Sequence, residues 1–102
     1  MTFENLCERL TALGGELVEE SAAEELEGVD FSDLKACDFK SSACFALPIE
    51  RSYLELRAVA YTACRMIIVY AFDDGEEADF ALFGVPYLDY AYERAVRAAI
   101  LK

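Results

Sequence analysis

The chain reads MIIVYAF at residues 66–72, DDGEE at 73–77 and FALF at 80–83. Two runs rich in β-branched and aromatic residues on either side of a short polar loop predict a β-hairpin. The first run has no polar alternation, which indicates a strand covered on both of its faces. We therefore expect a hairpin at about 65–84, and the rest of the fold is organised around it.

The length and composition of the chain favour a single compact domain, 1–102. A chain of 102 residues is long enough for one hydrophobic core but not for two. Its residues are 56% hydrophobic, which is too apolar for a disordered acidic segment, although the formal net charge is -11. The protein is expected to fold without a metal ion or a disulfide.

Two helices are predicted before the hairpin. Thr2 can cap the first, whose apolar residues recur every three or four positions from Phe3 to Leu13, and Gly14-Gly15 ends it. The second is predicted over 16–27, where acids lie about 200° around the helix from an apolar stripe. The stripe consists of Val18, Ala22 and Leu26, and the acids are Glu16, Glu20, Glu24 and Glu27, flanked by Glu19 and Glu25. Gly28 is placed to end this helix, and Asp30 can cap a short turn through Phe31, Leu34 and Cys37.

The later elements are a strand, an ambiguous segment and a helix. Alternation at 44–49 predicts a short strand ended by Pro48. The segment 53–61 fits a helix, which we favour, or a strand, and one long helix over 49–72 is a third alternative that the β-branched run disfavours. After Pro86 a last helix is predicted, with Leu88, Tyr92, Ala95, Val96 and Ala99 facing inward. The predicted fold is α+β: two N-terminal helices and a C-terminal helix packed on a small, mostly antiparallel sheet.

The sequence lacks most catalytic apparatus. It contains no histidine, which excludes Ser-His-Asp and Cys-His pairs and imidazole metal ligands. Gly14-Gly15 ends a helix rather than opening one, so no phosphate-binding loop is predicted. The acidic loop 73–79 lacks the ligand spacing of an EF-hand and is interpreted as a solvated turn. We expect no catalytic residues, no metal and no cofactor, and hence no enzyme.

The cysteines and the N-terminus indicate a cytoplasmic protein. The four cysteines are Cys7, Cys37, Cys44 and Cys64, and no two form a CxxC pair. Cysteines at such spacings usually behave as small buried hydrophobic residues. Residues 1–5 do not begin a signal peptide, and the one apolar stretch near membrane length, 58–72, is interrupted by Arg65. We therefore expect no membrane association.

The distribution of charge points to a protein partner. Residues 1–34 carry a net charge of -9, residues 35–72 carry +2, and residues 73–102 carry -4. A domain this acidic is repelled by phosphates, so direct nucleic-acid binding is not expected. The alternative is that the acids only keep the protein in solution. The candidate residues for binding a basic protein surface are Glu16, Glu19, Glu20, Glu24 and Glu27, with Asp73, Asp74, Glu76 and Glu77 as a second contact.

In size, acidity and lack of catalytic motifs, the chain resembles the small phage-encoded anti-CRISPR and anti-restriction proteins. The resemblance covers bulk properties only, and no motif is matched. It implies an inhibitor of a basic nucleic-acid-handling protein, such as a nuclease or a CRISPR effector, with nucleic-acid mimicry as one possible mode of binding.

Two other functional classes remain open. A self-associating structural or adaptor protein would form a homodimer through Tyr87, Tyr90 and Arg94 of the last helix, because tyrosine and arginine are enriched at interfaces. The alternative for these tyrosines is packing on the sheet. An enzyme of unrecognised type would use tyrosine and carboxylate groups for acid-base chemistry.

Overall fold

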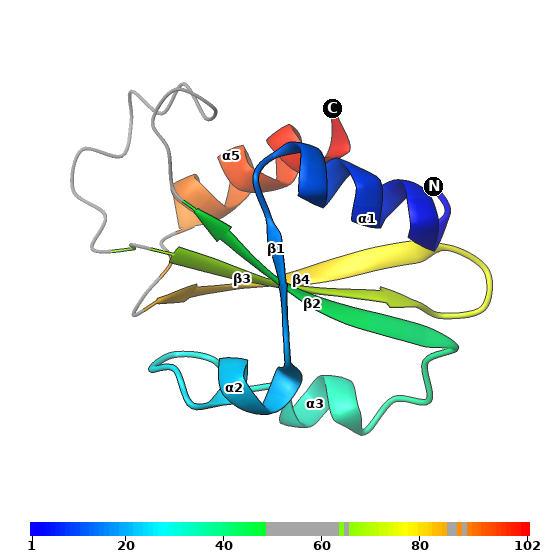
Figure 1. Ribbon diagram of the computed structural model, residues 1–102, viewed down its shortest axis with the longest axis horizontal. Coiled ribbons are helices and arrows are strands. Elements are labelled where there is room, and N and C mark those ends of the chain that lie inside the picture. Colours follow the sequence, from blue (N-terminus) through cyan, green and yellow to red (C-terminus); the bar gives the residue numbers. More distant parts are fainter. Residues whose placement is uncertain (49–63, 65, 86–87, 89) are drawn as a thin grey trace.

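The computed structural model describes residues 1–48, 64, 66–85, 88 and 90–102. In these residues the chain forms four helices and one four-stranded sheet of order β1-β2-β3-β4, labelled as in Figure 1. In chain order the elements are α1 (Phe3–Ala12), β1 (Glu16–Val18), α2 (Glu20–Glu24), α3 (Ser32–Lys35), β2 (Ser41–Pro48), β3 (Met66–Asp73), β4 (Ala78–Val85) and α5 (Tyr90–Leu101). All three strand pairings are antiparallel, so the predicted α+β class is confirmed.

Helices cover both faces of the sheet. Figure 1 shows α1 and α5 above it and α2 and α3 below it. This arrangement follows from β3, whose residues are apolar on both sides. Ile67, Val69 and Ala71 are buried in the core formed with α1 and α5, whereas Ile68 and Tyr70 are buried on the side of α2 and α3. The prediction of a strand covered on both faces is confirmed.

Strands β3 and β4 form the predicted hairpin. The register pairs Met66 with Val85 at its open end and Asp73 with Ala78 at the turn. β-branched and aromatic side chains favour this extended pairing. Residues 66–72 lie in β3, so the alternative of one long helix over 49–72 is wrong for these residues.

Helix α1 begins and ends as predicted. The backbone N–H of Asn5 donates a hydrogen bond to the Thr2 hydroxyl at 3.1 Å, which caps the helix. Leu6 and Leu10 are fully buried against the sheet. Gly14 ends the helix at φ +92°, a conformation that residues with a side chain rarely adopt. The chain then turns and continues into β1, which pairs with β2.

The predicted helix over 16–27 is wrong in its first part. Residues 16–18 form β1, paired with residues 44–46 of β2, and α2 covers only five residues. Pairing with β2 provides hydrogen bonds for the backbone of β1, and this tertiary contact outweighs the helical pattern. A continuous helix would also have placed Glu16 one turn from Glu20, where like charges repel.

The apolar side of α2 differs from the prediction by one residue. Ala23 is buried and Ala22 is exposed. Val18, which lies on β1, and Leu26, which follows α2, also pack against this core, but not from the predicted helix. The helix ends before the predicted stop at Gly28. The shift follows from the late start of the helix, because the residues that face the sheet depend on where helical geometry begins.

The next two elements follow the sequence pattern. Asp30 accepts a hydrogen bond from the backbone N–H of Ser32 at 2.9 Å at the start of α3. This bond lowers the pKa of the Asp30 carboxyl. Strand β2 runs over Ser41–Pro48 and begins three residues before the predicted strand at 44–49. Residue 49 lies outside the described residues, so the predicted stop at Pro48 stays a prediction.

Helix α5 packs through Tyr92 and Val96 as predicted, and also through Ile100. Ala95 and Ala99 are half-buried at the sides of this contact. The predictions for 53–61, Pro86 and Tyr87 lie outside the described residues. None of the helices described by the structure is long and apolar enough to cross a membrane.

Candidate protein-binding surface

The acids of residues 16–27 lie on β1, at the N-cap of α2, on α2 and in the turn that follows it. The exposed members are Glu16, Glu19, Glu25 and Glu27. Within the described part of the chain none of these four forms an ion pair. Residues 10–34 contain eight acids and no lysine or arginine. The negative charge of this surface is therefore largely uncompensated by neighbouring residues in the sequence.

Two of the predicted binding residues are held by the protein's own side chains. The Lys35 ammonium forms an ion pair with the Glu24 carboxylate, which joins α3 to α2 and raises the pKa of Lys35. The Ser42 hydroxyl donates a hydrogen bond of 3.4 Å to Glu20. These two carboxylates are consequently less available to a partner than the four exposed ones.

The acidic turn between β3 and β4 uses its aspartates to hold its own backbone. Asp73 accepts a bond from the N–H of Gly75 at 2.8 Å, and Asp74 accepts bonds from Glu76 and Glu77 at 2.9 Å. The bonds to Asp74 lower the pKa of its carboxyl. These contacts give the aspartates a structural role in the turn.

Two acids of this turn extend outward. Glu76 and Glu77 are both exposed. The Glu77 carboxylate also lies 3.7 Å from the N-terminal ammonium of Met1. In the parts of the chain that the structure describes, no group of three or more acidic or cysteine side chains is arranged to hold a metal ion.

The two predicted acidic contacts do not form one continuous surface. In Figure 1, α2 lies below the sheet at the left, and the turn between β3 and β4 lies at its right-hand end near the N-terminus. The chain between them passes through α3, which carries Lys35, and the segment containing Lys40. Basic residues therefore follow the first acidic group before the second is reached.

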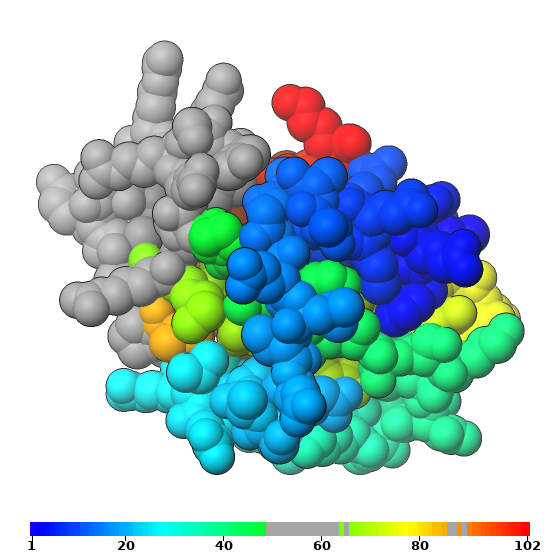
Figure 2. All heavy atoms as spheres, viewed as in Figure 1, coloured from blue at the N-terminus to red at the C-terminus, as the bar shows by residue number. Residues whose placement is uncertain are grey.

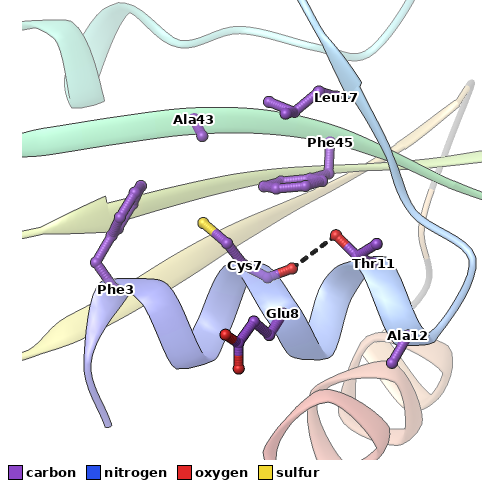
Figure 3. Close-up of a pocket in the computed structure, with 8 residues that line it drawn as sticks. All are labelled: Phe3, Cys7, Glu8, Thr11, Ala12, Leu17, Ala43 and Phe45. Atoms are coloured by element: carbon purple, nitrogen blue, oxygen red, sulfur yellow. Dashed lines mark hydrogen bonds between the residues drawn. The ribbon is translucent and has the colours of Figure 1, made fainter.

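An open apolar groove lies between α1 and the β1 edge of the sheet (Figure 3). Its volume is about 600 Å³. The side chains that line it are Phe3, Cys7, Glu8, Thr11 and Ala12 of α1, Leu17 of β1, and Ala43 and Phe45 of β2. Sequence patterns did not indicate this groove, because they predicted a helix at Leu17. The sequence signal for an apolar surface here was Leu17 itself, which lies outside the predicted stripe of Val18, Ala22 and Leu26.

The chemistry of the groove suits apolar side chains rather than catalysis. Figure 3 shows the Cys7 sulfur pointing toward the sheet and the Glu8 carboxylate pointing away from it. Burial raises the pKa of the Cys7 thiol, so this group is neutral at physiological pH and is a poor nucleophile. The Thr11 hydroxyl donates to the Cys7 carbonyl at 2.9 Å.

Strand β1 forms one edge of the sheet and carries the most exposed part of the groove. Leu17 is 72% exposed. Figure 2 shows the segment containing β1 crossing the front of the molecule between α1 and α2. Among the described residues no strand pairs with the outer side of β1. Apolar surface, open backbone groups and exposed acids therefore adjoin one another on a single segment.

The predicted self-association residues are only partly placed. Tyr90 begins α5 and is 73% exposed, so its ring does not pack on the sheet. The Arg94 guanidinium lies 5.9 Å from the centre of that ring. Tyr87 lies outside the described residues. A small aromatic and cationic surface is thus present at the start of α5.

Comparisons of this chain with protein-family models, with curated proteins and with solved structures found no match. The site is accordingly defined by its geometry. We define the β1 edge site as the surface formed by β1 with its residue Glu16, the adjacent Glu19, and the apolar groove.

Proposed function

We propose that this protein is a non-enzymatic binding module that docks on a basic surface of a nucleic-acid-handling protein, such as a nuclease or a CRISPR effector, and inhibits it in the cytoplasm. The observation that carries the proposal is the β1 edge site, where exposed carboxylates that form no ion pair with the described residues adjoin an open apolar groove. Interfaces commonly combine an apolar centre with a polar rim. Charge on the rim attracts the partner and orients it.

The arrangement of the acids supports docking by charge rather than imitation of a phosphate row. Duplex DNA carries one charge for about every 1.7 Å of its axis. Acids four apart on a helix are about 6 Å apart, and here Glu16 lies on a strand while Glu20 and Glu24 lie on α2. The ion pair between Glu24 and Lys35 neutralises a further charge.

The experiment is capture of partners by the tagged full-length protein, with identification by mass spectrometry at about 50 mM and about 400 mM salt. Attraction between exposed charges is screened over about 10 Å at 0.1 M ionic strength. We expect recovery of a basic, nucleic-acid-handling protein at low salt and its loss at high salt. The purified pair is then tested for inhibition of that partner.

Paired charge reversals locate the contact. The test variant combines Glu16→Lys with Glu19→Lys, and the control combines Asp38→Lys with Asp79→Lys, neither of which is a candidate binding residue. Both change the net charge equally, and all four positions are exposed. Binding should fall at least about tenfold in the test variant and less than about threefold in the control. Equal binding by the wild type and both variants would contradict the proposal.

Self-association through α5 is a second candidate, favoured by the exposure of Tyr90 beside Arg94. This candidate predicts a dimer whose population rises with protein concentration in sedimentation experiments. The Tyr90→Ala substitution should abolish that dimer. Tyr92→Phe is no suitable control, because that ring is buried; Leu101→Ser changes an exposed residue at the far end of the same helix. A monomer at high micromolar concentration excludes this candidate.

A further inference from the structure

We propose that the partner adds an extended segment to the outer edge of β1, inserting an apolar side chain beside Leu17 and presenting lysine or arginine toward Glu16. This inference rests on the proposed function, because it specifies how a cationic partner docks. The structural basis is the juxtaposition, within the β1 edge site, of a strand edge with which no described strand pairs, an apolar groove, and acids that form no ion pair among the described residues.

The backbone of β1 provides the first contact. Strands at the edge of a sheet direct alternate N–H and C=O groups away from it, where an added strand can pair with them. Strand β1 is only three residues long, so pairing alone offers few hydrogen bonds. A second source of binding energy is therefore needed.

The groove provides that second contact. Side chains alternate between the two faces of a strand. Leu17 pairs with Phe45 and faces α1, whereas Glu16 pairs with Ala46 and faces the side of α2. In an added strand, a residue beside Leu17 thus lies over the groove, and its two neighbours lie on the side of Glu16. The edge selects a segment in which basic and apolar residues alternate.

Charge disfavours a second copy of this protein as the occupant. Two copies joined through β1 would bring together two segments that each carry eight acids and no base over residues 10–34. Like charges on neighbouring strands are destabilising, and each copy has a formal net charge of -11. A cationic segment meets the same edge with attraction.

The test uses the full-length, isotopically labelled protein and the synthetic peptide acetyl-Lys-Val-Lys-Leu-Lys-Val-Lys-amide, with binding followed by NMR at about 50 mM salt. We expect the largest amide shifts at Leu17 and Val18, with slower hydrogen exchange there. Alkylation of Cys7, which lies in the groove, should slow on binding. Alkylation of Cys37 on the exposed α3 side should not change.

Three control peptides separate the contributions to binding. Glutamate in place of lysine removes the charge attraction, serine in place of valine and leucine removes the apolar anchor, and N-methylation of alternate amides removes strand pairing. Each change should weaken binding by about fivefold or more relative to the parent peptide.

Matched protein variants locate the anchor. Leu17→Ser should weaken peptide binding about tenfold or more, because a leucine-sized contact is lost. Leu101→Ser should leave affinity within about twofold. Both positions are exposed, at 72% and 57%, so both variants are expected to fold, which circular dichroism checks.

Other results of these experiments would contradict the docking mode, the proposed function or the choice of occupant. Shifts centred on α5 or on residues 73–77, or equal binding of the N-methylated peptide, would refute docking at the β1 edge while leaving a cationic partner in place. Absence of binding by any lysine-containing peptide at millimolar concentration would refute both the docking mode and the proposed function. A dimer abolished by Leu17→Ser would identify a second copy as the occupant and overturn the inference.

Discussion

Leu17 lies directly opposite Phe45 in the β1–β2 register, yet Leu17 is 72% exposed and Phe45 is 2% exposed. Both side chains point to the face of the sheet that α1 covers. The helix reaches across Phe45 but leaves Leu17 as the outer wall of the groove (Figure 3). Leu17 is exposed because β1 is the edge strand, whereas Phe45 is buried because β2 lies inside the sheet.

The two residues should differ in their effect on stability. Leu17→Ser should change the free energy of unfolding by less than about 0.5 kcal/mol, as is usual at exposed positions. Phe45→Ala should lower it by about 3–5 kcal/mol, because it leaves a cavity in the core. Urea denaturation of both variants checks the prediction. A loss above about 2 kcal/mol for Leu17→Ser would mean that this side chain belongs to the core.

The ion pair between Glu24 and Lys35 should contribute little to stability. The Glu24 and Lys35 side chains are partly exposed, at 30% and 46%, and water screens the attraction between charges at such sites. A double-mutant cycle with Glu24→Gln and Lys35→Met measures the coupling. Glu25→Gln is the control, since Glu25 is a neighbouring exposed acid. A coupling that amounts to a large share of the total free energy of unfolding would contradict the prediction.

Asp74 should make stability depend on pH in the acid range. Its pKa in the folded protein lies below the ordinary value of 3.8, because backbone N–H groups donate to the carboxylate. The stabilisation is therefore complete above the unfolded pKa and is lost as pH falls through the folded pKa. Wild type should exceed Asp74→Asn in melting temperature at pH 7, and the difference should shrink below about pH 3.8.

Glu76→Gln is the control for this effect. Glu76 lies in the same turn, and its side chain is exposed. The melting temperature of the Glu76→Gln variant should differ little from that of the wild type across the same pH range. A constant difference between wild type and Asp74→Asn from pH 7 to pH 2 would show that the charge of Asp74 is not responsible.

The cysteines should react with thiol reagents in a definite order. Cys37 is exposed and should react first, and Cys7 should follow because partial burial raises its pKa. Burial raises the pKa of Cys44 to about 11, so only about one thiol in a thousand is ionised at pH 8. Cys44 and the buried Cys64 should react only after unfolding. Mass spectrometry of timed samples checks the order, which labelling of Cys44 as fast as Cys37 would contradict.

Local sequence patterns predicted the helices and strands whose determining residues lie within the element or directly beside it. The hairpin has a polar turn between two β-prone runs, and α1 has both a cap at Thr2 and a stop at Gly14. Helix α5 shows apolar residues at helical spacing, including Val96. In each case the residues that determine the element are close together in the sequence, so one window of sequence contains the information.

Local sequence patterns did not predict strand β1. Three residues are too few for alternation to be recognised, and Glu16 and Leu17 also fit a helix. The strand exists because β2, nearly thirty residues later, offers an edge with which residues 16–18 pair. The same non-local contact determines the groove, which combines residues from three elements.

The sequence by itself determined the α+β class, the central hairpin, the ends of α1 and the excess of acids over bases, because each depends on composition or on neighbours along the chain. Only the tertiary structure decided that Glu24 is paired with Lys35, that the acidic turn lies apart from α2, and that Leu17 stands exposed beside an apolar groove. The physical reason is that pairing, burial and exposure depend on which distant segments meet, and those contacts outweigh the weaker preferences of short segments.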